Sequence, residues 1–178
     1  MYVIATHNGY NEVPRVNIDE YPALKDWFDY GDWNDKPEKG NNIERLSKRT
    51  DKGDTPYNLR DCAYMDDFSK QKIIFPAIMS KGPFFALDNG GFMVVAPGNV
   101  LTGNIQMEQL LLFLTTIGYW LLRRFYMGGG IEGELKVNRL EALPVPTWLA
   151  NARSAEDYYI RYDFTTEEIK LISSSVKA

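Results

Sequence analysis

Five short segments rich in apolar and β-branched residues predict β-strands along this chain. They cover residues 2–6, 72–76, 83–88, 91–96 and 99–102. Asn89-Gly90 stands between the third and fourth segments, and this dipeptide is a strong signal for a tight hairpin turn. Pro76 marks either an edge or the end of its strand, since proline donates no ladder hydrogen bond. The pattern predicts a mixed, mainly antiparallel sheet.

Apolar residues at helical spacing predict three main helices, at residues 19–29, 106–126 and 165–175, with a short additional helix at 42–49. Asp19 is the expected cap of the first helix, and Pro22 falls in its first turn, where a missing N–H does no harm. Thr165 and Glu168 have the spacing of a capping box. The glycines at 128–130 are expected to stop the longest helix. Helices flanking a sheet define the α+β class.

The predicted elements group into a main domain, residues 1–147, and a C-terminal tail with a helix, residues 148–178. A length of 178 residues is enough for one domain with such an appendage. The first predicted strand opens almost at the first residue, which is unusual for a complete domain. We therefore expect the chain to be cut from a longer protein.

The net charge of −4 counts against DNA binding through bulk electrostatics. The acidity is local, however: residues 1–43 hold eight acidic and four basic residues, and the remaining acids and bases cancel. A basic face elsewhere on the molecule remains compatible with this balance.

The chain has one cysteine, Cys62, so it forms no internal disulfide, and a reducing, cytoplasmic location is expected. No secretory signal pattern is present in the first thirty residues. The longest apolar run, 110–122, is interrupted by Thr115, Thr116 and Gly118, which favours a buried helix over a membrane span. No membrane partner and no metal centre are predicted.

A polar segment, residues 44–61, is the main candidate for a binding surface. Arg49, Lys52 and Arg60 bracket Gly53 and Tyr57 in it. An arginine can hold a guanine edge or a phosphate through two hydrogen bonds, and a tyrosine can bond a phosphate. The alternative is a solvated surface with internal salt bridges. A similar choice applies to Arg123-Arg124, which either bind phosphate or complement the dipole at a helix end.

The order of the segments resembles the TaqI-like C-terminal specificity domain, the target-recognition part of bacterial adenine-N6 DNA methyltransferases and of fused type II restriction–modification enzymes. The matching segments are Tyr2-Val-Ile-Ala-Thr-His-Asn-Gly9, Asp19-Glu-Tyr-Pro-Ala-Leu-Lys25, Arg49-Thr-Asp-Lys-Gly-Asp-Thr-Pro-Tyr-Asn-Leu-Arg60, Lys72-Ile-Ile-Phe-Pro76, Phe85-Ala-Leu-Asp88, Leu101-Thr-Gly103 and Leu143-Pro-Val-Pro146. The family usually has a basic stretch before the first strand, and this chain has none.

This resemblance implies that the chain recognises a DNA sequence and carries out no reaction itself. The catalytic domain, with its S-adenosylmethionine site, would lie outside this chain in the same polypeptide, and would flip an adenine out of the duplex. The implied partners are double-stranded DNA and that catalytic domain, and no cofactor is expected in this fragment. Besides Arg49, Lys52, Tyr57 and Arg60, the expected DNA-binding residues are Lys70, Lys72 and Lys81.

Two other functions stay open at the level of sequence. An acidic, aromatic-rich chain is also suited to a protein–protein adaptor that does not bind DNA. A small hydrolase would need His7 together with carboxylates, and a Cys62–His7 pair is a weaker form of the same hypothesis.

Overall fold

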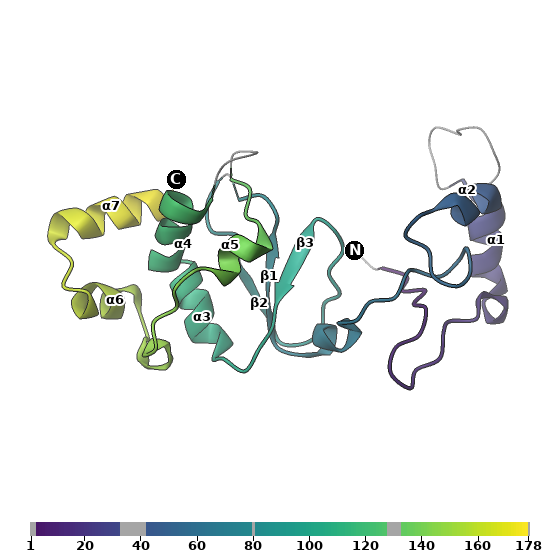
Figure 1. The fold of residues 1–178 in the computed structure, drawn as a ribbon, viewed down its shortest axis with the longest axis horizontal. Helices are drawn as coiled ribbons and strands as arrows, with labels where there is room; N and C mark the ends of the chain where they lie inside the picture. The colour runs from purple at the N-terminus through teal and green to yellow at the C-terminus, as the bar shows by residue number, and fades with distance from the viewer. Residues whose placement is uncertain (1–2, 33–41, 80, 128–132, 178) are drawn as a thin grey trace. The chain divides into compact units, whose positions relative to one another are not determined.

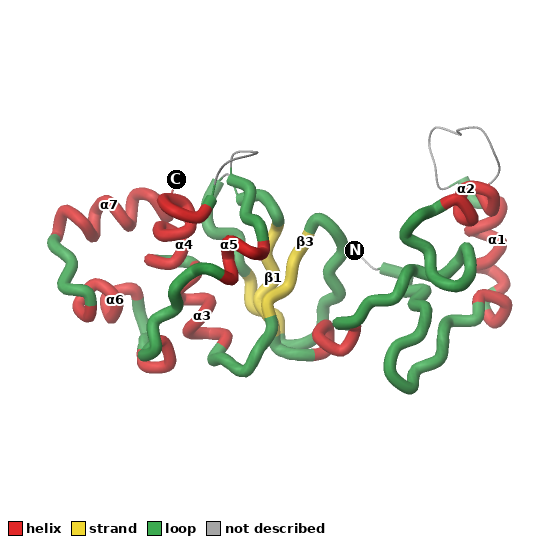
Figure 2. The backbone as a smooth tube through the Cα atoms, in the orientation of Figure 1, coloured by secondary structure: helices red, strands yellow, loops and turns green. Residues whose placement is uncertain are grey.

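A computed structural model gives the fold of this α+β protein and describes residues 3–32, 42–79, 81–127 and 133–177 (Figure 1). The chain divides into two compact units, Met1–Met65 and Asp66–Ala178. In the described residues, the named strands all belong to the second unit, whereas the first unit consists of short helices and loops (Figure 2). The boundary predicted at residue 147 falls inside the second unit.

The first unit contains a 3-10 turn, η1 (Ile18–Glu20), and two helices, α1 (Pro22–Tyr30) and α2 (Asn42–Lys48). Pro22 lies in the first turn of α1, as predicted. The predicted cap was wrong: Asn17 accepts the Asp19 N–H at the start of η1, and Tyr21 is the N-cap of α1. The carboxylate of Asp19 is instead ion-paired with Lys25, at 3.0 Å.

The strand predicted at residues 2–6 is absent from its described part, residues 3–6. Val3 and Ile4 are 43% and 62% exposed, so no second layer covers the apolar side chains that suggested a strand. Thr6 makes the contacts to the rest of the unit: its carbonyl accepts the Leu59 N–H at 2.8 Å, and its hydroxyl donates to the Tyr57 carbonyl at 2.7 Å. A ladder of backbone bonds, which defines a strand, does not form.

The second unit is built on an antiparallel sheet of three strands, β1 (Lys72–Pro76), β2 (Ala86–Asp88) and β3 (Gly98–Leu101), in the order β2-β1-β3. The first strand has its predicted limits, and Pro76 ends it. The strand predicted at 83–88 is present in shorter form as β2, and the strand predicted at 99–102 is present as β3, shifted by one residue. The sheet is antiparallel throughout its described strands, without the parallel pairing that a mixed sheet requires.

The hairpin predicted around Asn89-Gly90 was wrong, because residues 91–96 form no strand and β2 pairs with β1. The carboxylate of Asp88 accepts the N–H groups of Gly91 and Phe92, at 3.2 and 3.1 Å, and so occupies donors that a hairpin ladder would use. Gly90 has a φ of +103°, and a Cβ there would lie 2.2 Å from the carbonyl oxygen of Ser69. The turn thus packs against the segment that precedes β1.

The single helix predicted at 106–126 is divided into α3 (Met107–Leu114), α4 (Ile117–Leu121) and a π-helical turn, η3 (Leu122–Tyr126). The Thr115 and Thr116 hydroxyls donate to helix carbonyls one turn earlier, at 2.8 and 2.6 Å. Such side-chain bonds compete with the backbone ladder and bend helices. The glycines at 128–130, predicted to stop this helix, lie outside the described residues. Among the described helices, none combines the length and apolar composition needed to cross a membrane.

Four further helical segments complete the second unit together with a 3-10 turn, η2 (Met65–Ser69), at the junction. They are α5 (Val137–Glu141), η4 (Leu149–Asn151), α6 (Ala155–Arg161) and α7 (Thr166–Lys177). The capping box of the last helix is confirmed: Thr165 donates its N–H to Glu168 at 2.8 Å, and its hydroxyl accepts the Glu168 N–H at 3.3 Å. α5 and α6 were not predicted.

The core of the second unit joins the sheet to the C-terminal helices. Ile73 and Phe75 of β1, Phe113 of α3 and Tyr158 of α6 are all buried in one cluster. The rings of Phe113 and Tyr158 lie 5.8 Å apart. Burial raises the pKa of the Tyr158 hydroxyl to about 12. The residues after 147 are therefore part of the core, and contribute to the stability of the unit.

Lys72 and Asp88 form a buried ion pair where β1 and β2 face each other in register. The Lys72 side chain is fully buried, and it also donates to the Phe68 carbonyl at 2.6 Å. Burial by itself would raise the pKa of the Asp88 carboxyl, but the hydrogen bonds from Lys72, Phe92 and Gly91 outweigh it and lower that pKa to about 2.

The low pKa of Asp88 predicts that the second unit loses stability in acid. A carboxyl with a lower pKa in the folded than in the unfolded chain stabilises the fold above its unfolded pKa, near 3.9. This contribution disappears as the pH falls through the folded value, about 2. The urea midpoint should hold down to about pH 5 and fall steeply between about pH 4 and 2. An Asp88→Asn variant should show a shallower decline, and an identical decline would contradict the assignment to Asp88.

Candidate nucleic-acid interface

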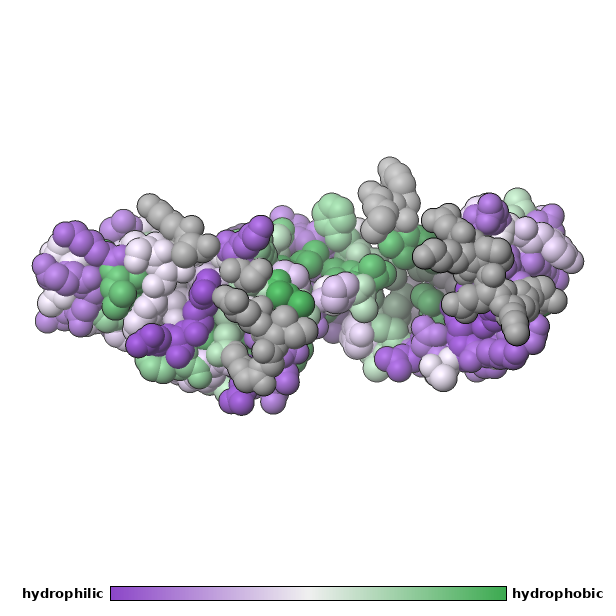
Figure 3. Space-filling model, turned by 90° about the horizontal axis from the view of Figure 1, so that it is seen from above, coloured by the Kyte–Doolittle hydropathy of each residue, from purple (hydrophilic) through white to green (hydrophobic). Residues whose placement is uncertain are grey.

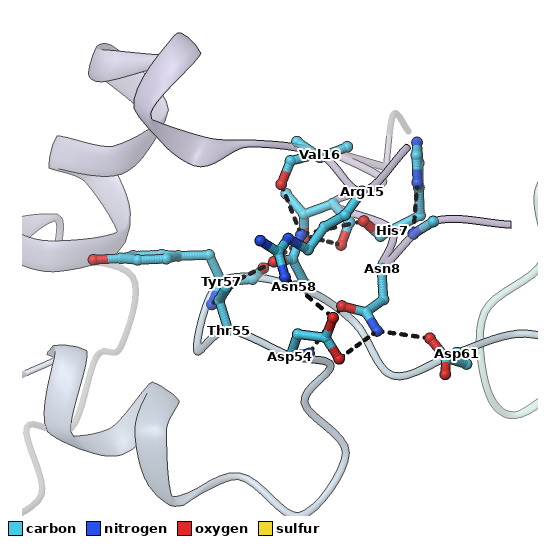
Figure 4. Close-up of polar contacts among 11 residues, drawn as sticks. His7, Asn8, Arg15, Val16, Asp54, Thr55, Tyr57, Asn58 and Asp61 are labelled. Carbon is cyan, nitrogen blue, oxygen red and sulfur yellow. Dashed lines mark hydrogen bonds and ion pairs between the residues drawn. The ribbon is translucent and has the colours of Figure 1, made fainter. Parts of the chain in front are cut away.

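The 49–61 loop, which holds four of the predicted DNA-binding residues, is attached to the 7–16 segment by the buried amide of Asn58 (Figure 4). The Asn58 Nδ2 donates to the carbonyls of His7 and Val16, at 3.1 and 3.0 Å. Its Oδ1 accepts the hydroxyl of Thr55, and its carbonyl accepts the Gly53 N–H at 2.8 Å. One side chain thus joins the loop to two parts of the 7–16 segment.

A second amide, Asn8, holds the loop from the side (Figure 4). Its Nδ2 donates to carboxylates of Asp54 and Asp61, at 3.1 and 2.7 Å, and its Oδ1 accepts the Asp54 N–H at 2.8 Å. Arg15 is ion-paired with the same Asp54, at 3.1 Å. Gly53 allows this close approach, because a Cβ there would lie 2.5 Å from the Asn8 side chain.

Arg49 is directed into the loop, where it supports the backbone. Its Nη2 donates to the Asn58 and Pro56 carbonyls, at 3.0 and 3.4 Å, and its Nε lies 3.7 Å from the Asp51 carboxylate. The side chain is 30% exposed. The guanidinium therefore acts mainly as a brace for the loop, which reduces its capacity to contact DNA.

Tyr57 is held by the helix α1. Its hydroxyl donates to Asp29 at 2.8 Å, and its ring lies 6.2 Å from that of Phe28. Burial is the main cause that raises the pKa of this hydroxyl, and the hydrogen bond to Asp29 raises it further. The position of the ring is thereby set before any ligand binds.

Lys52 and Arg60 are the exposed cations of the loop. Lys52 donates to the Ser47 carbonyl at 2.6 Å, which leaves its charge without a carboxylate partner in the described residues. The Arg60 backbone N–H donates to the Asp51 backbone carbonyl at 3.0 Å. Within the described part of the chain, the Arg60 guanidinium has no hydrogen bond or ion pair.

The three predicted DNA-binding lysines of the second unit have different surroundings. Lys72 was wrong as a DNA-binding residue, because it is fully buried against Asp88. Lys70 is exposed and ion-paired with Asp67 at 2.7 Å. Lys81 is exposed, and no described residue pairs with it. Arg49, Lys52, Tyr57 and Arg60 thus lie on one loop of the first unit, where their side chains have different partners, whereas these lysines belong to the second unit.

Asn8 and Asn58 were missed by the sequence analysis. No periodic pattern marks them, because the partners of their side-chain N–H groups lie 42 to 53 positions away in the chain. Asn58 binds the His7 and Val16 carbonyls, and Asn8 binds the carboxylates of Asp54 and Asp61. The only local signal is Asn8-Gly9, a turn dipeptide.

His7, which the hydrolase hypothesis requires, makes contacts with neighbouring residues of its own loop. His7 accepts the Gly9 N–H through Nδ1 at 3.3 Å, and its ring meets Tyr10 edge-on at 5.0 Å. No carboxylate bonds to His7 within the described residues, and those residues contain no metal-binding cluster of His, Cys, Asp and Glu.

Comparison with known proteins finds no matching family model, no matching curated protein and no matching solved structure.

Proposed function

We propose that this chain is a DNA target-recognition domain of a type II restriction–modification adenine-N6 methyltransferase. In this proposal the methyl donor, S-adenosylmethionine, binds to a catalytic domain of the same polypeptide outside this chain. The first unit contacts double-stranded DNA through the 49–61 loop. Arg60 and Lys52 provide the contacts to phosphate or base edges.

The observation that carries the proposal is the exposed guanidinium of Arg60 on a loop of fixed shape. The acids of the loop have partners inside the first unit: Asp54 with Arg15, Asp51 with Arg49, and Asp61 with Asn8. Arg60 remains available, although the loop as a whole is nearly neutral. A preorganised loop loses less entropy on binding than a loose one, so a single free arginine contributes more to affinity.

Replacing Arg60 with glutamine should weaken DNA binding about tenfold, within the range of 1–3 kcal/mol for one good arginine contact. If Arg60 contacts a phosphate, the salt dependence should also decrease by roughly one released counterion. Fluorescence anisotropy of a labelled duplex, titrated between about 50 and 200 mM salt, measures both effects.

Lys48→Gln is the control for net charge, because it removes one positive charge from a 71% exposed side chain of the same unit that, unlike Arg60, is ion-paired, with Glu44 at 2.6 Å. It should change the affinity less than twofold in this titration, roughly 0.4 kcal/mol. Equal effects of Arg60→Gln and Lys48→Gln would show that only net charge matters, and would count against the 49–61 loop as the interface.

A protein–protein adaptor is the second candidate function, and exposed apolar side chains of the second unit favour it. Phe84, Phe92 and Val95 are 52%, 68% and 51% exposed. Apolar residues lie at the surface among polar ones in Figure 3. Exposed aromatic groups of this kind are common where proteins meet. Absence of DNA binding even at the lowest salt concentration would favour the adaptor.

A further inference from the structure

A hollow of about 310 Å³ in the second unit is lined by Trp120, Arg123, Arg124 and Ser175, and we call it the arginine hollow. Trp120 belongs to α4, the two arginines to η3, and Ser175 to α7. Its size is at the lower end of the range of small-ligand sites. All of its described lining residues belong to the second unit, whereas the 49–61 loop belongs to the first.

Three of the lining residues, Trp120, Arg123 and Arg124, come from one continuous helical segment. Positions three and four apart share one face of a helix, so Arg123 and Arg124 both follow Trp120 on the same side. The π-helical turn over 122–126 carries the arginines, and such turns are frequent at functional sites. The Trp120 ring is held edge-on against Phe125, with 5.9 Å between centroids. One face of the indole is thereby oriented before a ligand arrives.

The two guanidinium groups are exposed neighbours, and neither forms an ion pair or hydrogen bond with the described residues. This is notable in a chain whose net charge is −4, where carboxylates outnumber cations. The position at a helix end explains in part why two arginines without partners are found here, because a cation in the last turn interacts favourably with the helix dipole. That effect explains neither the indole nor the hollow beside it. Because both guanidiniums line the hollow, an anion bound there would meet two positive charges.

We propose that the arginine hollow binds one phosphorylated nucleotide. The guanidiniums of Arg123 and Arg124 hold the phosphate, since arginine gives paired, charge-assisted bonds to phosphate oxygens. The indole of Trp120 stacks on the base, an interaction worth about 1–3 kcal/mol per base. Ser175, whose hydroxyl donates to the Leu171 carbonyl at 2.9 Å, lines the hollow from α7.

The same chemistry is offered by a free mononucleotide and by a nucleotide in a single DNA strand. The proposal stands independently of the 49–61 loop, because the described residues that carry it all belong to the second unit. Isothermal titration of the full chain with dAMP, deoxyadenosine, inorganic phosphate and a short single-stranded oligonucleotide separates these sources. Binding of dAMP identifies a free nucleotide as a ligand, and binding of the oligonucleotide alone identifies a strand.

The test variant is Arg123→Gln/Arg124→Gln, in which both changes are at exposed positions and the fold should be retained. We expect its affinity for the ligand that binds to fall at least tenfold. The charge-matched control, Lys136→Gln/Arg139→Gln, removes two exposed cations of the same unit outside the hollow, and should change the affinity less than twofold. Circular dichroism of both variants verifies the fold.

Three results would overturn the proposal. The first is that neither dAMP nor the oligonucleotide binds. The second is an equal loss in the test variant and in the control. The third is that inorganic phosphate binds as tightly as the nucleotide, since the indole would then contribute nothing.

Discussion

Replacing Lys72 with methionine should destabilise the second unit by about 3–5 kcal/mol, the usual cost of removing one partner of a buried ion pair. Methionine fills a similar volume but leaves the Asp88 carboxylate with a buried negative charge. The N–H groups of Gly91 and Phe92 remain as its partners, and they only partly offset that charge. Denaturant unfolding, with hydrogen exchange to follow the amides of β1, measures the loss.

Lys70→Met is the matched control, two positions away and with the same chemical change. The ion pair of Lys70 with Asp67 is on the surface, where the lysine side chain is 60% exposed, so its loss should cost about 0–1 kcal/mol. In the double variant Lys72→Met/Asp88→Asn the buried charge is removed, and it should be more stable than Lys72→Met alone. If Lys72→Met and Lys70→Met cost the same, Lys72 does not stabilise the sheet in the way described.

Replacing Asn58 with alanine should destabilise the first unit by about 3 kcal/mol. The change leaves the Val16 carbonyl without the Asn58 donor and the Thr55 hydroxyl without its acceptor, and the His7 carbonyl keeps only the Val16 N–H, at 3.2 Å. Each buried polar group left unsatisfied costs about 1–3 kcal/mol, and rearrangement of the loop recovers part of this. Faster hydrogen exchange in residues 53–59 should report the loosened loop, and DNA affinity should fall with it if this loop is the interface.

The variant Asn8→Ala tests whether the loss of stability depends on the burial of the amide or on the number of hydrogen bonds it makes. Asn8 also joins the loop through its side-chain amide, but its partners Asp54 and Asp61 are at the surface, where water replaces a lost bond. The expected cost is about 1 kcal/mol, typical of one exposed hydrogen-bonded group. Equal costs for Asn8→Ala and Asn58→Ala would contradict the central role given to Asn58.

The loop of the proposed interface was predicted from local sequence. The polar segment around Gly53 and Tyr57 indicated a loop, and Arg49, Lys52, Tyr57 and Arg60 all lie on it. Their individual roles were not predictable, because Arg49 and Tyr57 are used by carbonyls and a carboxylate of the same unit. The DNA-binding role of the loop stays a prediction, as do the catalytic domain and the cofactor outside the chain.

Local sequence alone determined the features that depend on a few neighbouring residues. These are the strand β1 at 72–76, Pro22 in the first turn of α1, and the capping box of Thr165 and Glu168. They follow from side-chain chemistry and backbone geometry within a few positions, so a short window contains the information.

Tertiary structure decided the features that depend on distant partners. The Asp88 carboxylate pairs with Lys72 and accepts the N–H groups of Gly91 and Phe92, so a turn forms where the local pattern predicted a hairpin. The division of the long helix, by contrast, has a local cause in the Thr115 and Thr116 hydroxyls, which bond to carbonyls four positions earlier. The burial of Lys72 and the clamp made by Asn58 depend on groups that folding brings together. Burying a polar group costs free energy unless hydrogen-bond or ion-pair partners surround it, and the whole fold determines where those partners lie.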